Sequence, residues 1–119
     1  MLNSDTIVTQ RSWYKVARVE DFPANGGACI KVKDQQIAVF HFSRNNEWYA
    51  SQHLCPHRQQ MGLARGMIGD IQGEPKVACP FHKQTFSLKS GTCLSSDEYQ
   101  IQVYPVKVEK GFVYVGLEE

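Results

Sequence analysis

Short stretches of alternating apolar and polar residues, separated by turn-forming residues, make up most of this 119-residue chain. Turn signals stand at Asn25-Gly26-Gly27, Ser90-Gly91 and Lys110-Gly111. Nowhere do apolar residues recur at the three-to-four spacing of a helix over three turns. Many short strands, with a turn about every 8–12 residues, are typical of an all-β sandwich or barrel, and this is the predicted fold class.

The alternation also predicts where the strands lie. The candidate strands are 13–17, 28–33, 36–42, 47–51, 76–78, 84–88, 99–109 and 112–115. We expect Lys33-Asp34-Gln35 to turn a hairpin, and Pro105 to bend the strand at 99–109. Residues 53–74 contain four glycines and no sustained alternation, so they are predicted to be irregular, with one short strand near Met67-Ile68.

The composition is that of an ordinary globular domain, with 42% hydrophobic and 21% charged residues. At this length we expect one domain at 12–117, preceded by an N-terminal arm at 1–11. The net charge of +1 excludes the strongly basic surface of a dedicated nucleic-acid-binding protein. No run of 18 apolar residues occurs, so no membrane-spanning helix is expected.

The cysteines direct attention to metal chemistry. The first ten residues lack a basic residue and an apolar run, which argues against an export signal and favours a cytoplasmic location. In the reducing cytosol, grouped cysteines more often bind metals or catalyse reactions than form disulfides. Two of the four cysteines stand beside histidines. The other two, Cys29 and Cys93, are expected to be buried thiols.

Two motifs combine cysteine, proline and histidine: Cys55-Pro56-His57 and Cys79-Pro80-Phe81-His82. Thiolate sulfur and imidazole nitrogen are ligands of soft and borderline metal ions. Zinc would take all four ligands in one tetrahedron, whereas a Rieske-type [2Fe–2S] cluster binds two cysteines on one iron and two histidines on the other. Zinc fingers usually pair like with like, so one cysteine and one histidine in each motif favour the cluster. Zinc and a chance pairing remain alternatives.

The C-x-H and C-x-x-H motifs resemble those of the Rieske [2Fe–2S] family, and the segment 63–91 is similar to the small subunits of bacterial NAD(P)H-dependent nitrite reductases. The resemblance implies a Rieske-type β-sandwich or incomplete barrel with an inserted cluster-binding subdomain at about 53–83. It also implies a [2Fe–2S] cluster, whose cofactor and metal ligands are Cys55, His57, Cys79 and His82.

The same resemblance implies a partner, namely the large flavin- and sirohaem-containing subunit that reduces nitrite to ammonium. This chain would then transfer electrons and hold no catalytic residue of its own. One alternative is a stand-alone Rieske ferredoxin serving a ring-hydroxylating dioxygenase. Another is a cluster-free structural subunit of the reductase.

This chain departs from the high-potential members of the family at positions that affect the reduction potential of the cluster. Gln60 and Phe81 stand where those proteins carry a disulfide, and Gln84 and Phe86 where they carry hydroxyl groups that donate hydrogen bonds to sulfur. Fewer such hydrogen bonds lower the potential. The resemblance therefore implies a potential near the low end of the Rieske range of about −150 to +300 mV.

Residues around the motifs suggest how a partner would dock. Between residues 56 and 83 the basic residues outnumber the acidic ones, which favours a partner with an acidic patch. An apolar collar around the site is expected from Pro56, Met61, Leu63, Pro80 and Phe81. Neither His41 nor His53 is expected to bind the metal, and a supporting role for His53 is the less favoured interpretation.

Overall fold

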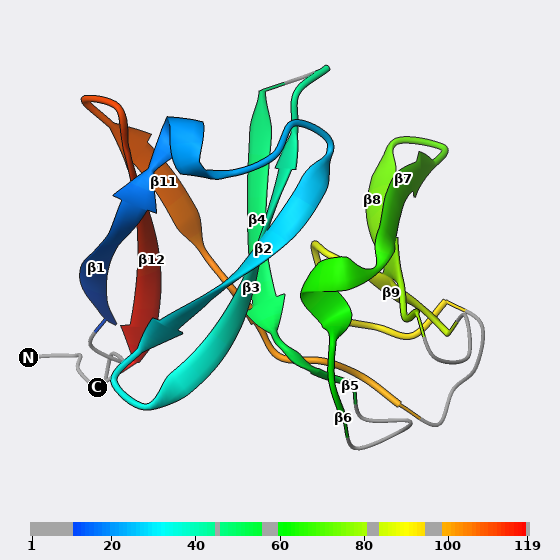
Figure 1. Cartoon of the computed structure of the whole chain (residues 1–119). Helices are drawn as coiled ribbons and strands as arrows, with labels where there is room; N and C mark the ends of the chain where they lie inside the picture. Colours follow the sequence, from blue (N-terminus) through cyan, green and yellow to red (C-terminus); the bar gives the residue numbers. More distant parts are fainter. Residues whose placement is uncertain (1–10, 45, 56–59, 81–83, 95–98, 119) are drawn as a thin grey trace, which may run out of the picture.

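The computed structural model describes residues 11–44, 46–55, 60–80, 84–94 and 99–118, and its elements are nearly all strands (Figure 1). The strands are β1 (Arg11–Arg18), β2 (Gly26–Val32), β3 (Gln35–Phe42), β4 (Glu47–Gln52), β5 (Leu54–Cys55), β6 (Gln60–Met61), β7 (Met67–Ile71), β8 (Glu74–Ala78), β9 (Thr85–Ser87), β10 (Val103–Tyr104), β11 (Val106–Glu109) and β12 (Phe112–Glu118). Two 3₁₀ turns, η1 (Val19–Asp21) and η2 (Leu63–Arg65), complete the described elements.

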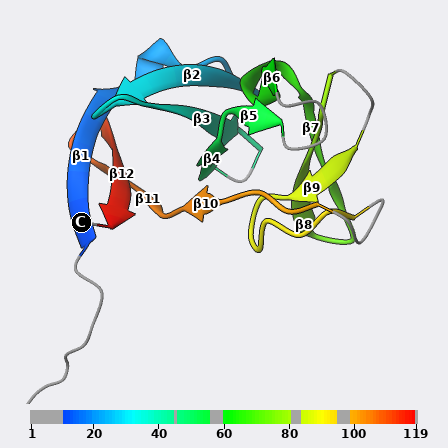
Figure 2. The same cartoon turned by 90° about the horizontal axis from the view of Figure 1, so that it is seen from below.

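Two antiparallel sheets form the larger part of the fold, with strand orders β1-β12-β11 and β10-β4-β3-β2. They curve around one apolar core. Figure 2 shows the curvature of the two sheets from below. Strands β1 and β2 lie at the edges of their sheets and share no ladder, so the barrel is incomplete. The all-β class predicted from the sequence, a sandwich or incomplete barrel, is confirmed.

Strand β3 separates two apolar cores, because successive side chains of a strand point to opposite faces of its sheet. Ile37 and Val39 pack into the first core, with residues of the β1-β12-β11 sheet. Ala38 and Phe40 pack into the second core, on the other face. All four side chains have 0% exposure, which explains why this strand reads as a continuous apolar run.

The second core belongs to the part of the molecule built from β5 to β9, on the right of Figure 1. It is covered by the β5-β6 pair, by η2 and by the three-stranded β7-β8-β9 sheet. Its buried members are Ala38, Phe40, Leu63, Ala64, Val77, Cys79, Phe86, Leu88, Cys93 and Ile101.

The turn predictions are largely confirmed, whereas the irregular segment contains more structure than expected. Lys33 and Asp34 turn the β2-β3 hairpin with φ of 49° and 73°, and Pro105 lies between β10 and β11. Residues 53–74 contain β5, β6, η2 and β7. Strands of two residues, such as β5 and β6, are too short to show a period of two, which is why the sequence pattern missed them.

Candidate iron–sulfur site

The first predicted ligand loop is closed by the β5-β6 pair. Leu54 pairs with Met61, and Cys55 pairs with Gln60. The four residues 56–59, including His57, lie between the two strands and outside the described residues, and only the backbone of Cys55 is described. Cys55 therefore stands at the base of a short antiparallel hairpin.

The second loop has the same frame. Ala78 pairs with Thr85 at the end of the β8-β9 ladder, and the next residue, Cys79, donates its backbone N–H to the carbonyl of Gln84 at 2.7 Å. Residues 80–83 lie between them, and His82 falls outside the described part of the chain. In both loops, four residues are thus enclosed between a cysteine and a glutamine. Cys79 is 1% exposed, so its side chain belongs to the second core.

The 3₁₀ turn η2 follows the first loop in the chain and packs against the strand β8, which leads into the second loop. At Gly66, directly after η2, an added Cβ would lie 2.3 Å from the carbonyl oxygen of Ala78, the residue before Cys79. On the other side of the turn, a Cβ on Gly27 would lie 2.6 Å from the carbonyl oxygen of Ala64. Glycine at these two positions allows the turn to pack tightly between β2 and β8.

His53, just before Cys55, fastens this turn to the first loop. Its Nδ1 accepts the Ala64 N–H at 3.2 Å, and its carbonyl accepts the N–H groups of Gly62 and Leu63, each at 3.0 Å. Burial and, secondarily, the positive charge of Arg65 lower the pKa of His53, which favours the neutral ring that this contact needs. The sequence pattern had made a supporting role for His53 the less favoured interpretation. Its position at a strand end, two residues before a predicted ligand, was the available signal.

Gln52 ties the same strand end to the returning chain. Its side-chain Nε2 donates to the carbonyl of Leu54 at 2.6 Å, and its Oε1 accepts the Gln102 N–H at 2.8 Å. The Gln52 N–H in turn donates to the Gln102 carbonyl at 2.9 Å. The base of the first loop is therefore held from two directions, by η2 and by residue 102.

The donor chemistry of this region fits a centre with two thiolate and two imidazole ligands. Both cysteines stand at the bases of matching loops, and both histidines lie within those loops in the sequence. Among the described residues no group of three or more metal-ligating side chains occurs. The ligand set of Cys55, His57, Cys79 and His82 therefore stays a prediction.

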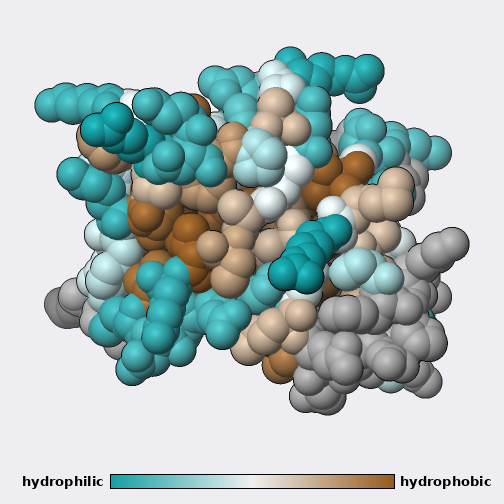
Figure 3. Space-filling model, viewed as in Figure 1, coloured by the Kyte–Doolittle hydropathy of each residue, from teal (hydrophilic) through white to brown (hydrophobic). Residues whose placement is uncertain are grey.

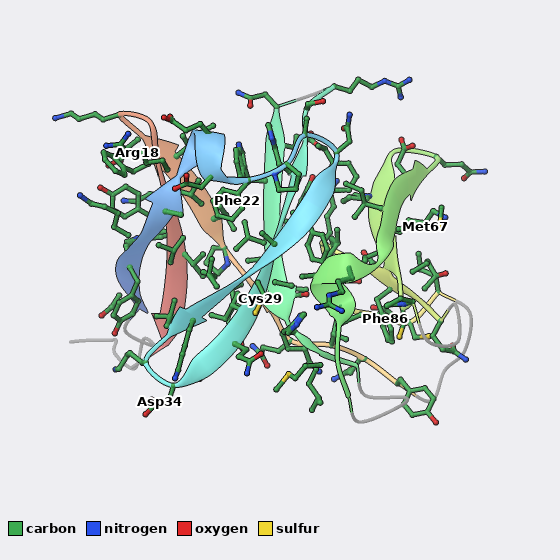
Figure 4. The ribbon with its side chains drawn as sticks, in the orientation of Figure 1. Arg18, Phe22, Cys29, Asp34, Met67 and Phe86 are labelled. Atoms are coloured by element: carbon green, nitrogen blue, oxygen red, sulfur yellow. The ribbon has the colours of Figure 1, made fainter. Side chains whose placement is uncertain are left out.

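Two expectations about neighbouring residues are wrong. Leu63 has 0% exposure and packs in the second core, so it takes no part in an apolar collar. Met61, by contrast, is 49% exposed. Figure 3 shows how apolar and polar residues are distributed over one face of the molecule. Cys29 is exposed on β2 rather than buried, because its side chain points away from the first core (Figure 4). Cys93 is buried as expected. Pro56 and Phe81 of the expected collar lie outside the described residues.

The described residues form an incomplete β-barrel with two matched cysteine-containing loops, one at the β5-β6 pair and one at the β7-β8-β9 sheet, as the resemblance to an iron–sulfur electron-transfer domain predicted. Residues 12–116 match the model of the Rieske-like [2Fe-2S] domain, and the chain belongs to this family. It is 30% identical to the nitrite reductase (NADH) small subunit of Escherichia coli K12, over 85% of this chain and 94% of that protein.

Two further similarities concern a longer protein and a solved structure. The chain is 34% identical to the nitrite reductase [NAD(P)H] large subunit of Klebsiella oxytoca over 92% of its own length, but it spans only 11% of that relative. The crystal structure of a putative NADH-dependent nitrite reductase small subunit from Mycobacterium tuberculosis superposes with a TM-score of 0.84 and 25% identity, covering 91% of this chain and 96% of that one. Within the described ranges, no helix has the length and apolar character to span a membrane.

Proposed function

We propose that this chain is the electron-transfer small subunit of an NAD(P)H-dependent nitrite reductase, with a [2Fe–2S] cluster bound by Cys55, His57, Cys79 and His82. The observation that carries the proposal is the match to the Rieske-like family over residues 12–116, in a chain that keeps all four ligand residues. Similarity to the Escherichia coli small subunit over 94% of its length supports the assignment to nitrite reductase.

The residues of the chain provide a rigid and partly dry site. Cys79 lies in an apolar core with Phe86 and Leu63, which keeps water from its sulfur. His53 and Gln52 hold the base of the first loop through hydrogen bonds, so that little entropy is lost on metal binding. A bound cluster of this type takes up and releases one electron at a time.

The partner in this proposal is the large flavin- and sirohaem-containing subunit, which would hold the nitrite site. In the Klebsiella relative the matching segment is a small part of one long polypeptide, which supports close association with such a large chain. We also propose a cytoplasmic location, where NAD(P)H is available. The chain would pass electrons within the complex and would not reduce nitrite alone.

The first test is an EPR spectrum of anaerobically purified, dithionite-reduced protein, together with iron and sulfide analysis. We expect a Rieske-type signal with about two irons and two sulfides per chain. Cys55→Ser should abolish the signal, whereas Cys29→Ser should retain it, since Cys29 lies on the exposed side of β2. A wild-type sample without iron after anaerobic reconstitution would contradict the proposal and favour the cluster-free structural subunit. Zinc in stoichiometric amount would favour the tetrahedral site.

A second test separates the reductase from a ring-hydroxylating dioxygenase. Purification of the tagged chain from its native host should recover a large polypeptide with sirohaem absorption. Recovery of an oxygenase instead would support the stand-alone ferredoxin. A redox titration tests the low potential separately, and a midpoint above about +200 mV, the upper part of the Rieske range, would contradict it.

A further inference from the structure

The outer face of the β1-β12-β11 sheet carries three aromatic side chains. The inner face of this sheet packs on the first core through residues such as Val113 and Val115, which have 0% exposure. Since successive side chains of a strand point to opposite faces, Trp13, Phe112 and Tyr114 lie on the outer face. Trp13 is 40% exposed. In Figures 1 and 2 no described element lies over this outer face.

Basic side chains lie over these rings. The Nζ of Lys107 is 4.6 Å from the ring centre of Trp13 and 5.6 Å from that of Tyr114. The Nζ of Lys15 is 4.4 Å from the ring centre of Phe112. Lys15 and Lys107 both stand opposite Tyr114 in the ladders, one on each neighbouring strand. The outer face is therefore an aromatic centre flanked by lysines.

This combination fits a protein surface with carboxylates around an apolar pocket. Trp and Tyr side chains are frequent anchors of interfaces, because they bury a large area with few rotatable bonds. Lys107 already forms an ion pair with Glu109 at 3.6 Å. Lys15 has no carboxylate partner among the described residues. An acidic partner would supply one and would be favoured over a basic one.

The Klebsiella relative indicates which partner covers this face. The matching segment spans 92% of this chain but only 11% of that protein, so the rest of the long polypeptide is joined to the segment at one or both of its ends. In this structure the two ends lie side by side, because Ser12 pairs with Leu117 at the end of the β1-β12 ladder. Whichever end carries the join, the remaining polypeptide meets the domain at this sheet, next to the outer face.

We propose that the outer face of the β1-β12-β11 sheet, centred on Trp13, Lys15 and Tyr114, anchors this chain to an acidic surface of the large reductase subunit. The inference rests on the proposed function, which names that partner. Two apolar cores and the sheet of β3 separate the outer face from Cys79. Because stacked sheets are about 10 Å apart, two such layers place the anchor about 20 Å from Cys79. Binding and electron transfer would therefore use separate surfaces of the chain.

The test measures the affinity of the cluster-loaded chain for the large subunit purified from the native host, by biolayer interferometry. We expect Trp13→Ala and Lys15→Glu each to weaken binding about tenfold or more, and Lys15→Glu to reduce its dependence on salt. Iron content, the EPR signal and the melting temperature should stay close to those of the wild type. In a nitrite reduction assay the KM for the variant chain should rise, whereas kcat at saturating chain should be unchanged.

Val108→Ala is the matched control for Trp13→Ala. Val108 lies on the same sheet and is 41% exposed, but it follows Lys107 on β11 and so points away from the outer face. Lys31→Glu, at an exposed position of β2, is the matched control for the change of charge. Both controls should bind like the wild type.

Equal affinities of Trp13→Ala, Lys15→Glu and the two controls would overturn the inference and leave the proposed function standing. Self-association of the chain that is lost in Trp13→Ala would make this face an interface between copies, which also overturns the inference. A wild-type chain with no affinity for the large subunit would overturn the proposed function and the inference together.

Discussion

Replacing Gly66 by alanine tests whether the close packing of η2 brings the two loops together. The new methyl group would lie 2.3 Å from the Ala78 carbonyl oxygen and 2.8 Å from a methyl carbon of Val77. Ordinary contact between such atoms begins near 3.4 Å, so the turn or the strand must move by about 1 Å. The turn cannot simply retreat, because its other side already packs tightly against Gly27.

The expected cost follows from this overlap. Inserting a methyl group into a well-packed region costs about 1–3 kcal/mol. For a chain of this length we expect each kcal/mol to lower the melting temperature by about 3–5 °C. Since the displaced strand leads directly into Cys79, Gly66→Ala should also reduce iron uptake at a given iron concentration.

The assay is thermal unfolding of the apoprotein by circular dichroism, followed by iron analysis after reconstitution. Gly69→Ala is the matched control, because its Cβ would meet only the end of the Lys76 side chain, at 3.5 Å. We expect this control to melt at or slightly above the wild-type temperature. If Gly66→Ala melts with the control and takes up the same amount of iron, the turn has room to adjust and the reasoning fails.

Three further predictions concern the surroundings of the site. His53→Leu leaves the buried Ala64 N–H without its acceptor and should cost about 1–3 kcal/mol in urea unfolding, and wild-type stability would contradict this. Burial and a neighbouring glutamate raise the pKa of Tyr49 to about 12, so the unfolded state ionises first and stability should fall as the pH rises above about 10. Tyr49→Phe should flatten that fall in melting experiments, and an unchanged slope would count against it. Phe40→Leu and Val39→Ala should each cost about 1–3 kcal/mol, but only Phe40→Leu should speed iron loss to a chelator, because the two side chains face different cores. Equal rates of iron loss from the two variants would show that the first core supports the site as much as the second core does.

The strands of the larger sheets were predictable because burial leaves a pattern in the sequence. A strand that faces one core alternates apolar and polar residues, and a strand between two cores is a continuous apolar run. The alternation at 13–17 and 112–115 marks β1 and β12, and the apolar run at 36–42 marks β3. In 53–74 the expected short strand near Met67-Ile68 is present as β7, but the pattern missed β5, β6 and η2, which are only two or three residues long and whose backbone path is decided by tertiary contacts. Residues 99–102 were expected to continue a strand, but β10 begins only at residue 103.

The sequence by itself determined the all-β class, the two cysteine–histidine motifs and the family, because these depend on local alternation and on the chemistry of adjacent residues. Only the tertiary structure decided that His53 fastens η2, that Leu63 is buried, and that Cys93 reaches Gln84. Each of these contacts joins residues about ten or more positions apart or depends on packing between elements. The reason is physical: local pattern specifies which face of an element is apolar, whereas the partner of a buried polar group is chosen by the fold as a whole.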